Sequence, residues 1–198
     1  MVALHYYLTE CDKNYFQILD TMDAKVGNVK AGYLLFPTIQ DMKISPAGQK
    51  NWILIHHIPK LVVFLVWLLT WIPQNALRFL IKSFMNLTSS TTKLSDASLR
   101  GILDLLNPTS VENMLYLAHT ELEDYVLAPD YDQVIRLKDQ LRFYYGTVDS
   151  WVPIKYYEAM IANVPGIQTE LCQRKIPHAF VLSSSEIMAT IVASWFNN

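Results

Sequence analysis

Cysteine is scarce in this 198-residue sequence, which contains only Cys11 and Cys172. Two thiols so far apart give neither a disulfide framework nor a metal-ligand spacing, and this scarcity is consistent with a reducing compartment. Basic runs are also missing and the formal net charge is −2, so no row of phosphates would be neutralised and a nucleic-acid partner is not expected. Any attraction to a membrane is therefore expected to be hydrophobic.

A secretory signal peptide is not expected either. Thr9, Glu10, Asp12 and Lys13 interrupt the apolar positions near the beginning of the sequence, where a signal would need a continuous apolar core. Apolar residues are abundant instead, because hydrophobic residues make up 52% of the chain and charged residues only 17%. A chain of this length can bury one sizeable core, and its composition predicts a further apolar partner.

The last third of the sequence has the pattern strand, loop, helix, strand, loop. Phe143–Tyr145 is an aromatic run of high β-propensity, and Asp149 lies on the loop that follows it. Residues 153–164 have apolar side chains at helical spacing, and residues 167–172 predict a second short strand before His178. An acid and a histidine therefore follow two successive strands.

Asp149 and His178 have the residue types of the acid and base of a nucleophilic triad. Open parallel sheets place their chemistry beyond the carboxyl ends of the strands, so both residues would come to one edge. The carboxylate would fix the imidazole tautomer and stabilise the imidazolium, and the order Asp then His is that of α/β-hydrolases. On spacing alone, an Asp149 that caps a helix and an ordinary loop His178 explain the pattern equally well.

Four segments resemble the lipid droplet-associated hydrolase family, a branch of α/β-hydrolases that are serine lipid esterases. They are residues 34–39 (Leu-Leu-Phe-Pro-Thr-Ile), 143–153, 155–158 (Lys-Tyr-Tyr-Glu) and 176–182. The resemblance runs from about Gly32 to Trp195 and is weakest around residues 51–110.

The resemblance implies a carboxylic ester hydrolase of lipid storage, with Asp149 as the triad acid and His178 as the triad base. Its partners would be a neutral lipid or lipid ester substrate and the lipid droplet surface. Its location would be that surface and the cytosolic side of the endoplasmic reticulum. Neither a cofactor nor a metal is implied.

The family's nucleophile lies in a Gly-His-Ser-x-Gly elbow, and no Gly-x-Ser-x-Gly occurs in this sequence. Met1–Cys11 is helical in pattern, and the segment Met1–Asp20 leads into a buried-type strand at Ala31–Phe36, the order that follows the elbow in an α/β-hydrolase. We therefore expect a truncated form that begins in or just after the nucleophile helix and is inactive alone. The alternatives are an unrelated fold with its natural start, and a non-catalytic protein that binds lipid-droplet or membrane surfaces and derives from an α/β-hydrolase.

The middle of the chain, residues 51–140, is predicted to form a helical lid. The apolar run 61–72 contains 12 residues, fewer than the roughly 20 that span a bilayer core, and residues 75–86 predict a second apolar helix. We expect a helical hairpin lying in a lipid surface, in preference to a cap folded wholly against the core. The expected lipid contacts are Trp52, Leu61, Phe64, Leu65, Leu68 and Trp71.

Local patterns predict the remaining elements. Residues 40–50 are expected to be a loop, and helices are expected over residues 96–106, 108–126 and 131–141. Asp96 and the pair Ser110 and Asn113 are expected caps, and Ser183 with Glu186 has the spacing of a capping box for a final helix that packs on the sheet. Its expected buried residues are Ile187, Ile191, Val192, Trp195 and Phe196.

Two groups of side chains could suggest a metal site, and each has a more ordinary explanation. His56 and His57 are adjacent, so on a helix their side chains diverge, and they are not expected to bind a metal. The acidic cluster of Glu121, Glu123 and Asp124 is expected to be a solvated helix end.

The predicted fold class is α/β: the last three strands of a partial α/β-hydrolase sheet with flanking helices and an inserted apolar helical lid. Residues 1–50 would hold the remainder of the nucleophile helix and a strand. Residues 51–140 would form the lid. Residues 141–198 would hold the strands that carry the Asp and the His, and the final helix.

Overall fold

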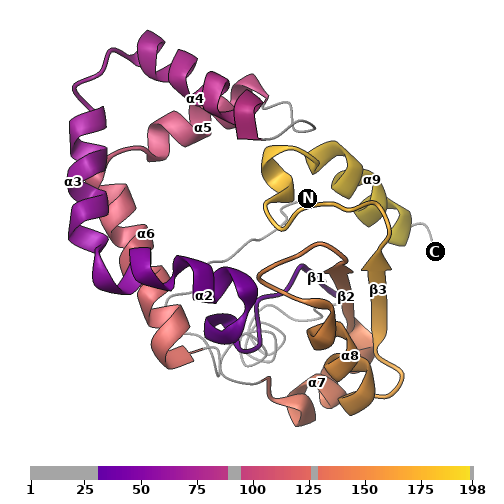
Figure 1. Cartoon of the computed structure of the whole chain (residues 1–198). Coiled ribbons are helices and arrows are strands. Elements are labelled where there is room, and N and C mark those ends of the chain that lie inside the picture. The colour runs from indigo at the N-terminus through magenta and orange to yellow at the C-terminus, as the bar shows by residue number, and fades with distance from the viewer. Residues whose placement is uncertain (1–30, 89–94, 126–128, 197–198) are drawn as a thin grey trace, which may run out of the picture. The chain divides into compact units, whose positions relative to one another are not determined.

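The computed structural model describes residues 31–88, 95–125 and 129–196 (Figure 1). The helix expected over Met1–Cys11 lies outside these residues. Contacts divide the described chain into two compact units. The sheet unit comprises residues 31–51, 117–125 and 129–175, and the helical unit comprises residues 52–88, 95–116 and 176–196.

The sheet unit contains a parallel three-stranded sheet with the order β1-β2-β3. Its strands are β1 (Gly32–Leu35), β2 (Leu141–Gly146) and β3 (Gln168–Cys172). Gly32 of β1 pairs with Leu141, and Gly146 of β2 pairs with Cys172. The three predicted strands are confirmed, and the fold is a mixture of helices with a small parallel sheet.

One face of the sheet packs against α7 (Tyr131–Leu137), which precedes β2 in the chain, and α8 (Ile154–Asn163), which follows it (Figure 1). Phe143 and Tyr145 point to this face because side chains alternate along a strand. The buried cluster consists of Leu34, Val134, Leu141, Phe143, Tyr145, Val152, Tyr156, Met160, Val164 and Ile167. Burying each large apolar side chain contributes about 1.5–3 kcal/mol, so this cluster holds the sheet unit together.

The middle strand is also buried on its other face. Tyr144 is buried there, and its ring meets the Phe36 ring edge to face at a centroid separation of 5.7 Å. A strand covered on both faces has a continuous apolar sequence rather than an alternating one. This is why Phe143–Tyr145 is an unbroken aromatic run.

The loop expected over residues 40–50 is wrong, because this segment contains a 3₁₀ turn, η1 (Met42–Ile44), and a helix, α2 (Pro46–Trp52). The buried Ser45 hydroxyl donates to the Met42 carbonyl at 2.7 Å and accepts from the Gly48 N–H at 3.0 Å. Ser45 therefore acts as a helix cap and Pro46 occupies the first helical position. A Cβ at Gly48 would collide with the Met42 carbonyl, which explains a glycine inside this helix.

The other elements are mostly helices. They are η2 (Ile53–His57), α3 (Pro59–Leu69), α4 (Gln74–Thr88), α5 (Asp96–Leu105), α6 (Pro108–Thr120), η3 (Glu121–Tyr125), η4 (Lys138–Gln140), η5 (Phe180–Leu182) and α9 (Ser185–Trp195). The helices predicted over the apolar run and over residues 75–86, 96–106 and 108–126 are confirmed in the residues that the structure describes, with π-helical turns at η2 and η3. The helix expected over residues 131–141 is too long, because α7 ends at Leu137 and Leu141 begins β2.

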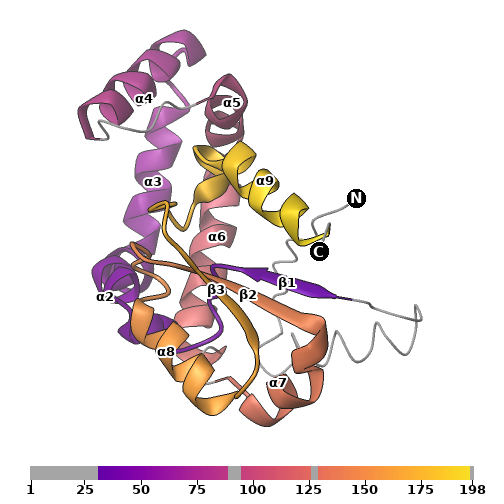
Figure 2. The same cartoon turned by 90° about the vertical axis from the view of Figure 1, so that its right-hand side faces the viewer.

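Within the helical unit, α3 and α4 diverge from the corner that joins them. Figures 1 and 2 show α4 leaving the end of α3 at an angle, with α5 beside α4. The expected pair of helices is therefore present, and it is splayed. Among the described residues no single helix is long and apolar enough to cross a membrane, whereas Pro46–His57 and Pro59–Leu69 pass that test only as a pair bent by 81°.

The predicted caps are wrong by one to three positions. Ser95, not Asp96, accepts the Ser98 N–H at the start of α5, and the Asn107 side chain, not Ser110, caps α6. Ser184, not Ser183, is the N-cap residue of α9, and its side chain makes no cap bond within the described part of the chain. Ile187 of α9 and Phe196, the residue after it, are exposed rather than buried, because Met188 and Trp195 occupy the buried stripe.

Candidate active site

Asp149 lies in the sheet unit on the loop after β2, as predicted, and it is buried with 7% of its surface exposed. The backbone N–H groups of Trp151 and Val152 donate to its Oδ1 at 2.8 and 3.1 Å. This is an Asx-type turn, in which a side chain fixes the backbone that follows it. The N-cap of α8 is Pro153, so the alternative in which Asp149 caps that helix is wrong.

Two hydrogen bonds from distant segments hold the Asp149 loop. The Ala47 N–H of α2 donates to the Ser150 carbonyl at 2.9 Å. The Thr147 hydroxyl donates to the Cys172 carbonyl at the end of β3, at 3.0 Å. A Cβ at Gly146 would lie 2.7 Å from the Phe36 ring, so only glycine fits between β2 and that ring. The carboxylate is thus presented on a loop whose backbone is fixed from two sides.

The edge where β1 and β3 end also contains unusual backbone conformations. Phe36, Asp41 and Lys175 have positive φ angles of 49°, 42° and 52°, and none of them is a glycine. Such residues cost free energy unless their surroundings impose the conformation, and they are frequent at functional sites. Phe36 follows β1 directly, and Lys175 follows the turn after β3.

His178 lies in the helical unit, on the turn that precedes η5, and it is half-buried. Along the chain it follows β3, and β3 ends beside β2 because Gly146 pairs with Cys172. Topology therefore directs the loops of both Asp149 and His178 away from the same edge of the sheet. The pairing of the two side chains stays a prediction, since they belong to different units.

A tyrosine cluster lies next to Asp41 in the sheet unit. The Tyr156 hydroxyl donates to the Asp41 carbonyl oxygen at 2.9 Å. Burial raises the pKa of Tyr156 to about 12, and the negative charge of Asp41 adds to this effect. The same two causes raise the pKa of Tyr131. Both phenols therefore stay neutral to higher pH than an ordinary tyrosine. Sequence patterns did not reveal the bond from Tyr156 because it joins residues far apart in the chain.

Five of the six expected lipid contacts are exposed. Leu61, Phe64, Leu65, Leu68 and Trp71 of the α3 segment are exposed, whereas Trp52 is half-buried. The rings of Phe64, Trp67 and Trp71 form a continuous row, with centroid separations of 5.7 and 5.3 Å. Trp71 has 74% of its surface exposed, which is unusual for such a large apolar residue.

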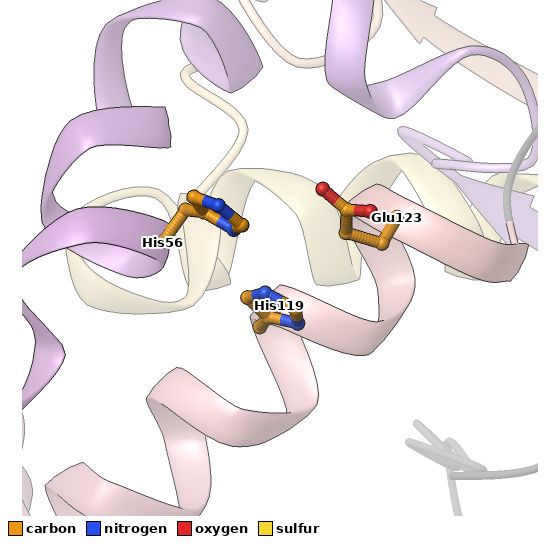
Figure 3. A group of neighbouring side chains, drawn as sticks. All are labelled: His56, His119 and Glu123. Carbon is orange, nitrogen blue, oxygen red and sulfur yellow. The ribbon is translucent and has the colours of Figure 1, made fainter.

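The residues drawn in Figure 3 are His56, His119 and Glu123. His119 and Glu123 project from consecutive turns of the α6–η3 segment in the sheet unit, and Glu123 Oε1 is paired with Lys43 Nζ at 3.3 Å. His56 belongs to the helical unit, where its ring stacks on Trp52 at 4.5 Å. Two ligands from one unit do not complete a metal site. The expectation that His56 and His57 bind no metal stays a prediction.

Comparison with known proteins identifies the family. A family model described as lipid-droplet associated hydrolase matches residues 15–181. A lipid droplet-associated hydrolase of Mus musculus is 36% identical over 171 residues, which cover 86% of this chain and 50% of that protein. Proteins with the same description from Gallus gallus and Drosophila melanogaster are 30% and 32% identical, over 83% and 81% of this chain.

The chain spans about half the length of the curated relatives it matches, since it covers 50% of the Gallus gallus protein and 51% of the Drosophila melanogaster protein. The match includes all three strands, the Asp149 loop and His178. This chain belongs to the lipid droplet-associated hydrolase family.

Proposed function

We propose that this chain supplies the acid and the base of a serine hydrolase that cleaves carboxylic esters of apolar lipids at the lipid droplet surface. The observation that carries the proposal is the buried Asp149 carboxylate, held on a fixed loop at the carboxyl-terminal edge of a parallel sheet in a chain of this family. We place its action in lipid storage, at droplets and on the cytosolic side of the endoplasmic reticulum.

In this proposal His178 takes the proton from a serine hydroxyl as the serine attacks the ester carbonyl, and then returns it to the leaving alcohol. Asp149 holds the imidazole in the required tautomer and stabilises its protonated form. No Gly-x-Ser-x-Gly occurs in the 198 residues, so the nucleophile and its oxyanion amides belong to a part of the enzyme outside this sequence. The 198-residue chain alone is then inactive.

An activity-based fluorophosphonate probe tests the proposal. We would compare the 198-residue chain with a chimera in which the part of the Mus musculus relative that this chain does not match precedes residue 15. The chimera should be labelled and the chain alone should not. Labelling of the chain alone at Ser150, Ser183, Ser184 or Ser185 that His178→Ala abolishes would contradict the proposed division of the triad.

The variant Asp149→Asn sharpens this test in the chimera. The Asn side-chain oxygen can still accept the N–H groups of Trp151 and Val152, so the loop should keep its conformation. Hydrolysis should nevertheless fall by about 10⁴-fold, because the imidazole is no longer held in the correct tautomer. Asp130→Asn is the matched control, since Asp130 also accepts a backbone N–H, that of Gln133, at 3.0 Å. Equal activity of both variants would remove Asp149 from the triad.

The second candidate function is non-catalytic binding to a lipid surface, which the exposed apolar helices α3 and α4 favour. Trp71, Phe79 and Phe84 have exposed fractions of 74%, 70% and 64%. Each large apolar side chain that enters lipid contributes about 1.5–3 kcal/mol at full burial. This function and catalysis are compatible, because the lipid contacts and the predicted triad use different residues.

A reporter fused to the full chain tests the lipid contacts in cells that contain droplets. Replacing Leu61, Leu65 and Leu68 by Asp should move the reporter from droplets to the cytosol. The control is Leu105→Asp on α5, where an exposed leucine of the same unit lies outside the expected lipid contacts. Unchanged droplet localisation of the triple variant would contradict the proposed surface.

A further inference from the structure

Charge is unevenly distributed along this chain. Its 18 acidic and 16 basic residues give a formal net charge of −2, yet no acidic residue occurs from Met42 to Ser95. That stretch contains six basic residues, which are Lys43, Lys50, Lys60, Arg78, Lys82 and Lys93. The segment that contains α2, α3 and α4 is therefore cationic in a chain that is slightly anionic overall.

In the helical unit, three of these cations lie on the two helices with the most exposed apolar surface. Lys60 is in the first turn of α3 and is exposed. Arg78 and Lys82 are four positions apart on α4, so they lie on neighbouring turns of one side of the helix. Arg78 is half-buried and Lys82 is exposed.

The helix α4 combines apolar and cationic stripes. Leu77, Leu80 and Phe84 follow each other at spacings of three and four along one stripe, and Leu80 and Phe84 are 50% and 64% exposed. Arg78 and Lys82 are each two positions from Leu80, and Lys82 is two positions from Phe84, so both cations lie on the polar side of the helix, away from this stripe. An apolar face with Lys and Arg on the polar face is the pattern of a helix that lies in a lipid–water interface, where the long cationic side chains reach the headgroups.

One cation of α4, Lys82, forms an exposed ion pair with Asp96 of α5. Lys82 Nζ is 3.3 Å from Asp96 Oδ1, and the two side chains are 53% and 82% exposed. Such an exposed pair contributes little to stability, so a lipid phosphate or carboxylate can replace Asp96 as the partner of Lys82. Asp96 therefore competes with an anionic surface.

We propose that helices α3 and α4, through the apolar side chains of Leu80 and Phe84 and the cations of Lys60, Arg78 and Lys82, bind a phospholipid monolayer that contains anionic headgroups in preference to a zwitterionic one. The inference rests on the proposed lipid-surface binding and adds the headgroup charge that the surface selects. It differs from the expectation, based on net charge, that any attraction to a membrane is hydrophobic alone. The apolar residues enter the acyl layer, and the three cations contact the headgroup charges.

The test measures binding of the full 198-residue chain to triolein droplets by flotation. One set of droplets is coated with phosphatidylcholine alone and the other with phosphatidylcholine and phosphatidylserine. Affinity for the anionic droplets should be higher by about fivefold for each cation near the surface. The difference should shrink as salt rises, because the Debye length falls from about 10 Å at 0.1 M to about 3 Å at 1 M.

Two variants with opposite expected effects identify the residues. The double variant Arg78→Gln and Lys82→Gln should lose most of the preference and keep its binding to phosphatidylcholine. Asp96→Asn should increase the preference, because Lys82 then has no competing carboxylate. Arg100→Gln is the matched control, since Arg100 lies between Asp96 and Asp104 on α5 and its charge is already balanced one turn away on each side.

The outcomes of this test distinguish a failure of the anionic preference from a failure of lipid-surface binding itself. Equal affinity for the two kinds of droplet at low salt would overturn the anionic preference and leave lipid-surface binding intact. Failure to float with either kind would overturn both. A preference that Arg100→Gln removes as strongly as the double variant does would also overturn the inference, because it would assign the effect to the overall charge of the chain rather than to α4.

Discussion

The sheet unit and the helical unit use similar apolar residues in opposite ways. In the sheet unit, Phe143, Tyr145 and Met160 are each at most 2% exposed. In the helical unit, Trp71 and Phe79 are 74% and 70% exposed. The buried side chains of the first unit stabilise the fold by leaving water, whereas the exposed ones on and beside α3 and α4 still have most of that free energy to gain from a partner.

This difference shows that the overall composition of the chain does not predict how much apolar surface either unit buries. A hydrophobic content of 52% could mean one large core, but the described apolar surface of α3 and α4 remains outside any core. The burial of each residue, rather than the residue type, separates the side chains that hold the fold from those available for binding. Substitutions that compare the two units test this separation directly.

The largest effect is expected from a phenylalanine pair. Phe143→Ala should lower the free energy of unfolding by about 3–5 kcal/mol, because it leaves a cavity in the buried cluster. Phe79→Ala should change it by less than about 0.5 kcal/mol, because the exposed ring loses few contacts. Hydrogen exchange of β2 amides and urea unfolding would measure both. Similar losses for the two variants would mean that Phe79 is part of a core.

Two glycine-to-alanine substitutions should change the free energy of unfolding in opposite directions. Gly146→Ala should destabilise the sheet unit by about 1–3 kcal/mol, since the added Cβ would meet the buried Phe36 ring at 2.7 Å. Gly101→Ala should stabilise α5 by about 0.5–1 kcal/mol, because no described atom lies within 4 Å of its added Cβ and alanine favours a helix. Thermal unfolding would measure the pair, and a stabilising Gly146→Ala would refute the close approach of Phe36.

The smallest effect concerns Tyr156 and alkaline pH. Its pKa is raised to about 12 in the folded chain from an ordinary value of 10.0, so the folded state favours the neutral phenol. The resulting stability is complete below pH 10 and is lost as the pH rises toward 12. Tyr156→Phe should cost about 1 kcal/mol at pH 7 through the lost bond to Asp41.

The Tyr156→Phe variant should also lose less stability than the parent chain between pH 9 and pH 11. Urea unfolding followed by circular dichroism at both pH values would show this. Some alkaline dependence should remain, because burial also raises the pKa of Tyr144 and Tyr145 in the same unit. An identical alkaline loss in parent and variant would exclude Tyr156 as a source of the dependence.

Local patterns in the sequence predict much of the sheet unit. The aromatic run at β2, the apolar spacing of α8 and the position of Asp149 after a strand are all features of short segments, and the structure confirms them. The contacts that hold the Asp149 loop could not be predicted in this way. The bond between Ala47 and Ser150 joins segments that lie far apart in the chain.

The wrong predictions concern positions where the same residue types are typical of two different local structures. Ser45 and Pro46 are typical of a turn, and they are equally typical of a helix cap followed by a first helical residue. Ser95 and Asp96 are both good capping residues, and only the geometry selects Ser95. On α9, the packing of Met188 and Trp195 determines which stripe is buried, so Ile187 is left exposed.

The pairing of β1 with β2 has a consequence for the order of folding. Gly32 lies beside Leu141, so this pair closes a loop that contains every element from α2 to α7. Pairing β2 with β3 closes only a loop around α8. Closing a loop costs chain entropy, and that cost arises before the contacts that compensate for it have formed. The shorter loop should therefore close first, so β2, α8 and β3 should assemble early and β1 should add to them late. Until it does, the exposed edge of β2 is open to pairing with another chain, and newly made protein is most prone to aggregate in that interval.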